Sequence, residues 1–147
     1  MRAYIDTNIF VYATYPSYPQ HEKARNFLKA CSDGSDSWFL SWGVVYEYLR
    51  VVTHPGLFSK ETLSFPKAAE NVLRFTSAKN VEILTETPEH TKLLSALTQE
   101  MKTISGNLLH DAHHVILMRE HDLKKIFTAD TDFHRFAGLE VVDPLQR

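Results

Sequence analysis

Short apolar runs alternate with longer amphipathic segments along this chain, and this alternation restricts the folds that it can adopt. The runs have the length of buried strands, and the segments between them repeat apolar residues at helical spacing. Strands separated by helices pair in parallel through right-handed crossovers, and helices then cover both faces of the sheet. We therefore predict an α/β fold, a three-layer α/β/α domain with a central parallel five-stranded sheet.

The five expected strands span residues 3–5, 38–41, 81–84, 125–128 and 139–142. The expected helices span residues 9–12, 20–31, 42–53, 65–77, 87–103 and 109–121. Thr7 or Asn8 has the right side chain and place to cap the first helix. Residues 33–37, with the sequence DGSDS, indicate a turn.

The composition is that of an ordinary globular protein, with 147 residues of which 44% are hydrophobic and 23% charged. We expect a single domain over residues 1–147. We also expect a cytoplasmic location without a membrane, because Asp6 comes too early for a signal segment and no apolar run is long enough to cross a bilayer.

One cysteine, Cys31, allows neither an internal disulfide nor a metal cluster. The net charge of -2 argues against tight nucleic-acid binding through bulk charge. This charge is compatible with an enzyme that binds its substrate through a metal ion and a local basic rim.

Four acidic residues stand where a parallel sheet would gather them. Asp6 ends the first strand and Asp130 follows the fourth, so they share the ligand-binding edge if these strands are neighbours. Glu47 stands on an otherwise apolar and aromatic helix, where an acid rarely lacks a partner. Asp111 opens a helix. Each also has a simpler explanation: Asp6 as a helix cap, Asp111 as a complement to the helix dipole, and Asp130 as a turn residue.

Together, the four carboxylates indicate a metal site. Clustered carboxylates repel one another and raise each other's pKa values unless a cation neutralises them. Several oxygen ligands without a nearby cysteine favour Mg2+ or Mn2+ over Zn2+. Mg2+ keeps several water ligands, so it can hold a phosphate oxygen and an attacking water together. That chemistry is phosphodiester hydrolysis.

Four short motifs contain these acids, at residues 3–8 (AYIDTN), 40–48 (LS and YEY at its two ends), 109–112 (LHDA) and 128–133 (TADTDF). They resemble the four motifs of PIN-domain nucleases, occur in the same order and span almost the whole chain. Residues 47–55 (EYLRVVTHP) are similar to a subset of VapC-type toxins from toxin-antitoxin pairs.

The resemblance implies a Mg2+- or Mn2+-dependent endoribonuclease that forms a homodimer and is blocked by an antitoxin protein. It also implies a structured RNA substrate, such as tRNA or rRNA. Carried over by position, it implies four catalytic, metal-binding acids, namely Asp6, Glu47, Asp111 and Asp130. Asp132 corresponds to an aspartate that lies near the metal in some members and is structural in others.

Other side chains are expected to support this site. Thr7, Asn8 and Thr128 would orient the carboxylates or a water. RNA contacts are expected from basic residues, although such residues usually face solvent: Arg50, Lys60, Lys124 and Arg135. Unpaired bases can stack on exposed aromatic rings, for which the candidates are Tyr12, Tyr15, Tyr18 and Trp42. Core packing or a dimer face explains these rings as well, and we prefer it for Trp42.

Three histidines, His110, His113 and His114, flank Asp111, and helical spacing puts His110 near the same face as the other two. These histidines are either exposed or core-edge residues without a catalytic role, or they act as a proton shuttle. A zinc site is less favoured, because a closed set of zinc ligands is not evident. Two competing functions are an inert PIN-like module that binds RNA or protein, and a Mg2+-dependent phosphatase. The inert module would lack one or more of the acids. A haloacid-type phosphatase would carry a second aspartate just after Asp6, and the chain has no glycine-rich phosphate loop.

Overall fold

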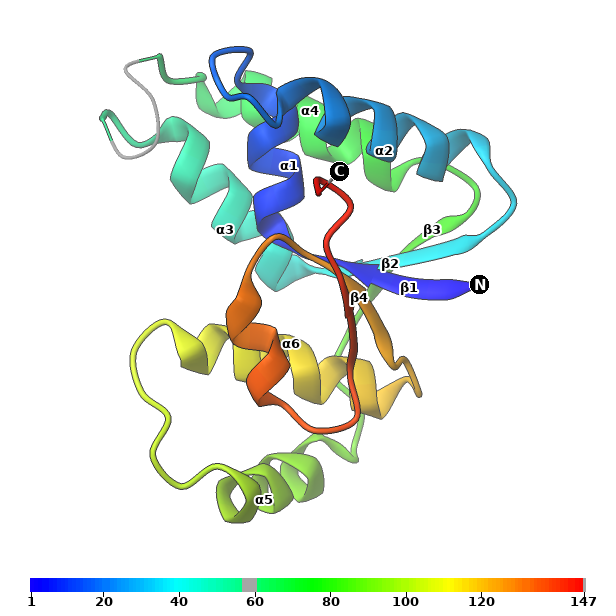
Figure 1. The fold of residues 1–147 in the computed structure, drawn as a ribbon, viewed down its shortest axis with the longest axis vertical. Helices are drawn as coiled ribbons and strands as arrows, with labels where there is room; N and C mark the ends of the chain where they lie inside the picture. Colours follow the sequence, from blue (N-terminus) through cyan, green and yellow to red (C-terminus); the bar gives the residue numbers. More distant parts are fainter. Residues whose placement is uncertain (57–60, 147) are drawn as a thin grey trace.

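The computed structural model describes residues 1–56 and 61–146, and within them strands and helices alternate as the sequence predicts (Figure 1). The strands are β1 (Arg2–Ile5), β2 (Ser37–Ser41), β3 (Val81–Leu84), β4 (Lys125–Phe127) and β5 (Glu140–Val142). The α-helices are α1 (Thr7–Thr14), α2 (His21–Asp33), α3 (Trp42–Thr53), α4 (Phe65–Thr76), α5 (His90–Glu100) and α6 (Leu108–Glu120). A 3-10 helix, η1 (Thr131–Arg135), precedes β5.

The five strands form one parallel sheet in the order β3-β2-β1-β4-β5. Ile5 of β1 aligns with Phe127 of β4, and the backbone N–H of Asp6 donates to the carbonyl of Phe127 at 3.1 Å. The carboxyl ends of β1 and β4 are therefore neighbours. This confirms the strand order on which the predicted gathering of Asp6 and Asp130 depended.

Helices cover both faces of the sheet, so the predicted three-layer fold is confirmed. Figure 1 shows α1, α2 and α4 on one side and α5 and α6 on the other, with α3 packed against α1 and α4. Ala3, Tyr4 and Ile5 of the central strand have no exposed surface. Such a strand is buried on both faces and therefore consists of nearly unbroken apolar residues. None of the helices in the described ranges is long and apolar enough to span a membrane.

The predicted strands differ from the observed ones by no more than one residue at either end, and the predicted helix at residues 42–53 is confirmed without change. Helix α2 continues to Asp33, so the predicted turn at residues 33–37 shortens to a bend at residues 34–36. The prediction that Thr7 or Asn8 caps α1 is wrong, because Asp6 is the N-cap.

Helix α5 is shorter than the predicted helix at residues 87–103. It begins at His90 because Thr87 is held in a turn by Glu120, which accepts hydrogen bonds from the backbone N–H and the hydroxyl of Thr87 at 2.7 and 2.8 Å. We predicted no helix at residues 131–135, where the 3-10 helix η1 lies. Its N-cap is Asp130, whose Oδ1 accepts the backbone N–H of Asp132 at 2.9 Å.

Candidate metal centre

Asp6 lies directly after β1 and is only 5% exposed. Its Oδ1 accepts the backbone N–H of Thr7 at 2.8 Å, which makes Asp6 the cap of α1. Its Oδ2 accepts the Thr128 hydroxyl at 2.8 Å and the Asn8 amide at 3.2 Å. Burial raises the pKa of Asp6, while His114 and the hydrogen bonds from Thr128 and Thr7 oppose the rise. The carboxylate is thus both a helix cap and a rigidly held acid at the sheet edge.

Asn8 and Thr128 lock the turn after β1 to the turn after β4. The Asn8 amide donates to Thr128 Oγ1 at 3.1 Å, and its Oδ1 accepts the backbone N–H of Ala129 at 3.2 Å. Thr128 Oγ1 also accepts the backbone N–H of Asp130 at 3.0 Å. These bonds fix the position of Asp130 relative to Asp6.

Glu47 reaches the same region from α3 and is partly buried. Thr7 Oγ1 donates to Glu47 Oε2 at 3.2 Å, and His114 Nε2 lies 3.8 Å from the same oxygen. The pKa of Glu47 is lowered, chiefly by its interaction with His114, while burial opposes the change and Thr7 and His110 assist it. The predicted need for a partner on this apolar helix is met by Thr7 and His114.

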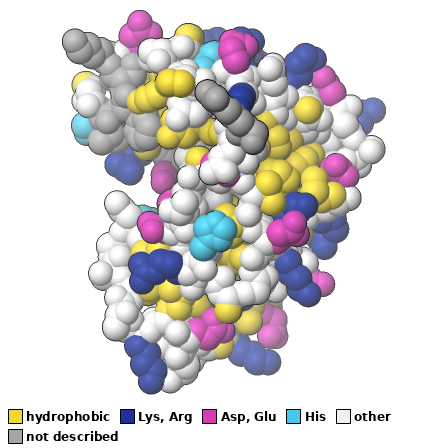
Figure 2. Space-filling model, in the orientation of Figure 1, with side chains coloured by type: hydrophobic (Ala, Val, Ile, Leu, Met, Phe, Trp, Pro, Cys, Tyr) yellow, Lys and Arg dark blue, Asp and Glu magenta, His cyan; other side chains and the backbone are white. Residues whose placement is uncertain are grey.

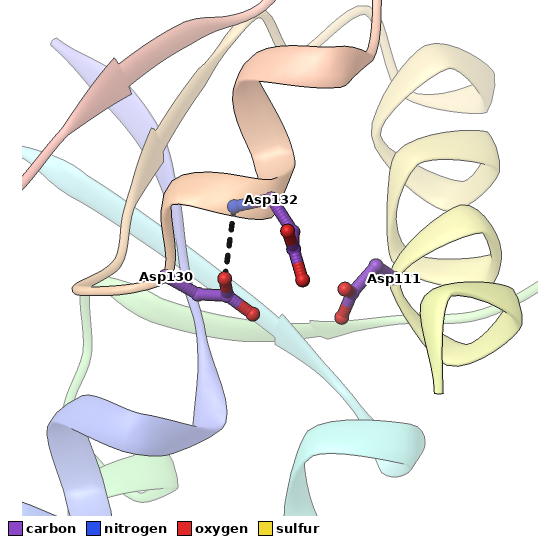
Figure 3. A group of neighbouring side chains, drawn as sticks. All are labelled: Asp111, Asp130 and Asp132. Atoms are coloured by element: carbon purple, nitrogen blue, oxygen red, sulfur yellow. Dashed lines mark hydrogen bonds between the residues drawn. The ribbon is translucent and has the colours of Figure 1, made fainter. Parts of the chain in front are cut away.

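Asp111, Asp130 and Asp132 form a close acidic group, with one oxygen from each within 4.8 Å of the others. Figure 3 shows their carboxylates directed toward one another, with Asp111 on α6 and the other two at the start of η1. Burial and the negative charges of Asp6 and Asp130 raise the pKa of Asp111 to about 7. The structure therefore brings Asp132, which the sequence left uncertain, into this group.

A cavity of 540 Å³ opens over these acids and is lined by Glu47, Asp111, Asp130 and Asp132 together with Tyr46 and Arg50. Asp6 lies close enough for its charge to affect the pKa of Asp111. The four predicted acids and Asp132 thus converge at the carboxyl edge of the sheet. Among the described residues, those that line the cavity include no cysteine or methionine, and Cys31 is buried on α2.

The predicted RNA-contacting residues are not all near this cavity. Arg50 lines it and is exposed. Lys124 lies before β4, at the opposite end of the strand from Asp130, and does not line the cavity. Arg135 is exposed at the end of η1 and does not line the cavity. Lys60 lies outside the described residues.

The aromatic predictions also need correction. Tyr15 is 4% exposed, and Tyr12 and Tyr18 are partly buried against the core. Trp42 is 48% exposed, because its position on α3 points away from the apolar face. Core packing is therefore wrong for Trp42, and a dimer face stays a prediction. Tyr46, which we did not single out, is 67% exposed and lines the cavity. Its spacing of four residues from Trp42 and from Arg50 was the signal that all three share one helix face.

The three histidines near Asp111 do not share one environment. His110 is exposed at the cavity, while Nε2 of His113 pairs with Glu86 Oε1 at 2.7 Å. His114 is 2% exposed and contacts Tyr4, with 2.7 Å between Nδ1 and the hydroxyl oxygen. The expectation of exposed or core-edge histidines therefore fails for His114, which is a buried residue.

Comparison with known proteins assigns the chain to a family. The family model described as a PIN domain matches residues 3–139. The chain belongs to the PIN-domain family. This PIN domain is 36% identical over 139 residues to Ribonuclease VapC48 of Mycobacterium tuberculosis, which covers 95% of this chain and 94% of the relative. It is 30% identical over 141 residues to Ribonuclease VapC33 of the same organism, with 96% of each chain covered.

Solved structures share the PIN fold at low sequence identity. VapBC2 from Rickettsia felis, bound to a DNA fragment from its promoter, gives a TM-score of 0.66 at 19% identity and covers 96% of this chain and 97% of that chain. VapC20 of Mycobacterium tuberculosis, described as a Sarcin-Ricin loop cleaving toxin, gives 0.63 at 15% identity, covering 95% and 98%. These comparisons confirm the resemblance that the four motifs indicated, and all four motifs lie inside the matched residues.

Proposed function

We propose that this PIN domain is a divalent-metal-dependent endoribonuclease and the toxin of a toxin-antitoxin pair. The observation that carries the proposal is the group of Asp111, Asp130 and Asp132, which shares one cavity with Glu47 and lies beside Asp6. The relatives named as VapC ribonucleases support RNA as the substrate. The structural neighbours that contain VapB with VapC support an antitoxin partner.

The donor set suits a divalent cation. The five acids offer only carboxylate oxygens, which Mg2+ and Mn2+ prefer over softer ligands. Burial, and then the negative charges of Asp6 and Asp130, raise the pKa of Asp111 to about 7, so a cation would favour the ionised form of this carboxyl. We assign the metal to the acids of this group, namely Asp6, Glu47, Asp111, Asp130 and Asp132. When bound, a divalent ion lowers the pKa of a bound water and offsets negative charge on the phosphate oxygens.

The protein's own residues position the reacting groups. Thr128, Asn8 and the N-terminus of α1 hold the Asp6 carboxylate in one orientation. Thr7 holds Glu47 at the side of the cavity. Carboxylates that are fixed in this way would hold a cation without rearranging during the reaction. Groups that are already oriented before the reaction are a main source of transition-state stabilisation.

RNA contact is assigned to the rim on α3. Arg50 supplies a planar guanidinium for a phosphate, and the exposed ring of Tyr46 supplies a stacking surface for an unpaired base. Figure 2 shows Lys and Arg side chains scattered among Asp and Glu on the visible face. The net charge of -2 agrees with recognition at a local rim. We propose structured RNA, such as tRNA or rRNA, as the substrate class.

The competing functions are less well supported. An inert PIN-like module has no use for five acids brought to one sheet edge against their mutual repulsion. The match to the PIN family over residues 3–139 disfavours the Mg2+-dependent phosphatase. A homodimer stays part of the proposal, and the molar mass from light scattering tests it directly.

Cleavage of total cellular RNA tests the proposed function. Wild-type protein, Asp6→Asn and Asp111→Asn are compared with Mn2+ and with EDTA. Discrete fragments are expected only from the wild type with Mn2+. Cleavage that persists in EDTA and in both variants would refute the metal-dependent mechanism.

A further inference from the structure

A buried polar cluster reaches the metal cavity through His114 and joins three elements of the fold. It consists of Tyr4 on β1, Ser41 at the end of β2 and His114 on α6, which are 0%, 2% and 2% exposed. The Tyr4 hydroxyl donates to Ser41 Oγ at 2.7 Å, and its oxygen lies 2.7 Å from His114 Nδ1. Ser41 Oγ lies 3.5 Å from the same ring nitrogen.

This cluster is tolerated in the protein core only because its polar atoms contact one another. Burial of a hydroxyl or an imidazole costs free energy unless each polar atom finds a partner, whereas apolar side chains of the same size need none. The neighbours of Tyr4 on the same strand, Ala3 and Ile5, are apolar and equally buried. The cluster therefore needs an explanation beyond the packing of the core.

The outer end of the cluster supplies that explanation, because it meets Glu47. His114 Nε2 lies 3.8 Å from Glu47 Oε2, the oxygen that also accepts the Thr7 hydroxyl at 3.2 Å. A carboxylate oxygen only accepts hydrogen bonds, so an imidazole nitrogen that faces it is best occupied by N–H. On the other side of the ring, the Tyr4 hydroxyl gives its one hydrogen to Ser41, so its oxygen accepts from Nδ1.

Close packing fixes the plane of the ring. A Cβ atom added at Gly43 would lie 3.3 Å from His114 Cε1 and 3.3 Å from Ser41 Oγ. The absence of a side chain at Gly43 therefore lets the first turn of α3 approach the imidazole closely. Because the ring is buried between this turn and Tyr4, it is placed to hold a neighbour and has little access to bulk water for proton exchange.

We propose that His114 is a positioning residue of the metal centre. Tyr4 and Ser41 orient its imidazole so that Nε2–H holds Oε2 of Glu47, which leaves Oε1 of the same carboxylate for the cation. This inference rests on the proposed metal-dependent function, and it adds a role for three residues outside the acidic group. Outer partners that orient a ligand in this way typically change metal affinity by about 10- to 100-fold when they are removed.

Two variants of His114 separate positioning from packing. In His114→Gln the amide nitrogen reaches the place of Nε2 and can still donate to Glu47. In His114→Asn the shorter amide reaches only the place of Nδ1 and keeps the contact with Tyr4. Isothermal titration of metal-free protein with Mn2+ should show a dissociation constant at least about 10-fold higher for the Asn variant and within about 3-fold of wild type for Gln.

Asp111→Asn, titrated in parallel, distinguishes the two possible failures. If Asp111→Asn loses Mn2+ while folded His114→Asn binds as tightly as the wild type, the positioning role is wrong and the metal site stands. If Asp111→Asn also binds Mn2+ like the wild type, the proposed function itself fails.

A measurement on the wild type covers the case in which both His114 variants unfold. Long-range ¹H–¹⁵N correlation spectra of metal-free protein report which nitrogen of each imidazole carries hydrogen. We expect Nε2 of His114 to be protonated, and Tyr4→Phe to alter the Nδ1 signal. A ring protonated only at Nδ1 would overturn the proposal.

Discussion

The hydroxyl of Thr128 donates a hydrogen bond to Oδ2 of Asp6 across 2.8 Å, between side chains that are 1% and 5% exposed. The same hydroxyl oxygen accepts the backbone N–H of Asp130 at 3.0 Å. One side chain thus fixes two of the acids relative to each other, although they follow strands that are far apart in the sequence.

Replacement of Thr128 by valine tests this link. Thr128→Val keeps the shape of the side chain but removes the donor of a buried bond to Asp6 and the acceptor of a partly buried bond from Asp130. Loss of one partner of a buried hydrogen bond costs about 1 to 3 kcal/mol, so we expect the free energy of unfolding to fall by that amount. Urea unfolding measures it, with Thr128→Ser as the control that keeps the hydroxyl. A valine variant as stable as the serine variant would contradict the prediction.

Asp111 should destabilise the metal-free protein at neutral pH. Its pKa in the folded protein, about 7, lies above the ordinary value of 3.8. Between these values the folded state binds more protons than the unfolded state, so stability falls as the pH rises from about 4 to 7. One pKa unit corresponds to about 1.4 kcal/mol, and because Asp111 is partly exposed we expect Asp111→Asn to gain only roughly 1 to 2 kcal/mol at pH 8.

Urea unfolding in EDTA at pH 8 and at pH 4 checks this gain. It should be largest at pH 8 and much smaller at pH 4, where the carboxyl is protonated in the folded state and about half protonated in the unfolded state, whose pKa has the ordinary value of 3.8. Glu82→Gln, an exposed position on β3, serves as the surface control. An equal gain at both pH values would show that the effect has another cause than ionisation.

The same carboxyl should make cation binding depend on pH. A metal ligand must be deprotonated, so binding of Mn2+ releases the proton of Asp111 below pH 7. We expect the dissociation constant for Mn2+ to fall about 10-fold per pH unit up to pH 7 and to level off above it, because one proton is displaced. Isothermal titration at pH 5.5, 6.5, 7.5 and 8.5 measures this. A flat profile across pH 7 would refute the role of Asp111 as the titrating ligand.

Most of the fold was predictable because its strands and helices have distinct periodicities. Asp6 and Asp130 converge because β1 and β4 are neighbours in the sheet. The apolar helix around Glu47 predicted that this acid has a partner, and Thr7 is one. These inferences needed only the position of each acid relative to a strand or a helix face.

What the sequence could not supply depended on tertiary packing. Helix α6 buries five consecutive residues, from His114 to Met118, so its pattern shows no exposed face from which the burial of His114 could be inferred. Asp132 fits a turn residue as well as a ligand, and only the geometry of η1 brings it to Asp111. The turn that delays α5 depends on Glu120, which is 33 residues away from Thr87.

Glu120 should stabilise the fold through that turn. Its side chain has no exposed surface and accepts hydrogen bonds from the Thr87 backbone and hydroxyl and from His90 Nδ1 at 2.7, 2.8 and 2.8 Å. Burial alone would raise the pKa of Glu120, but these bonds outweigh it and lower the pKa. A lowered pKa gives stability that is present above the ordinary value of 4.5 and is lost as the pH falls through the folded value.

Glu120→Gln should therefore lower the free energy of unfolding by about 1 to 3 kcal/mol at pH 7. The difference from the wild type should shrink as the pH falls from 4.5 through the lowered pKa of the folded state, because below that pKa the carboxyl is neutral in both states. Glu89→Gln is the matched control, since Glu89 lies on the same connection but is exposed. If both variants lose the same stability at pH 7, the hydrogen bonds of Glu120 are not the cause.

Arg50 should act on the affinity for RNA and not on the metal. It lines the cavity one helical turn from Glu47, whereas Lys124 lies at the opposite end of β4 from Asp130 and Arg135 lies outside the cavity. A phosphate contact supplies affinity that weakens with salt, so Arg50→Ala should raise KM for RNA roughly 3- to 10-fold and reduce the salt dependence of binding. Arg50→Lys should recover part of the loss because it keeps the charge but not the planar guanidinium. Lys124→Ala and Arg135→Ala are internal controls that remove one charge each at positions outside the cavity. A KM for Arg50→Ala equal to that of these two controls, with Mn2+ affinity unchanged in all three, would move the RNA path away from α3.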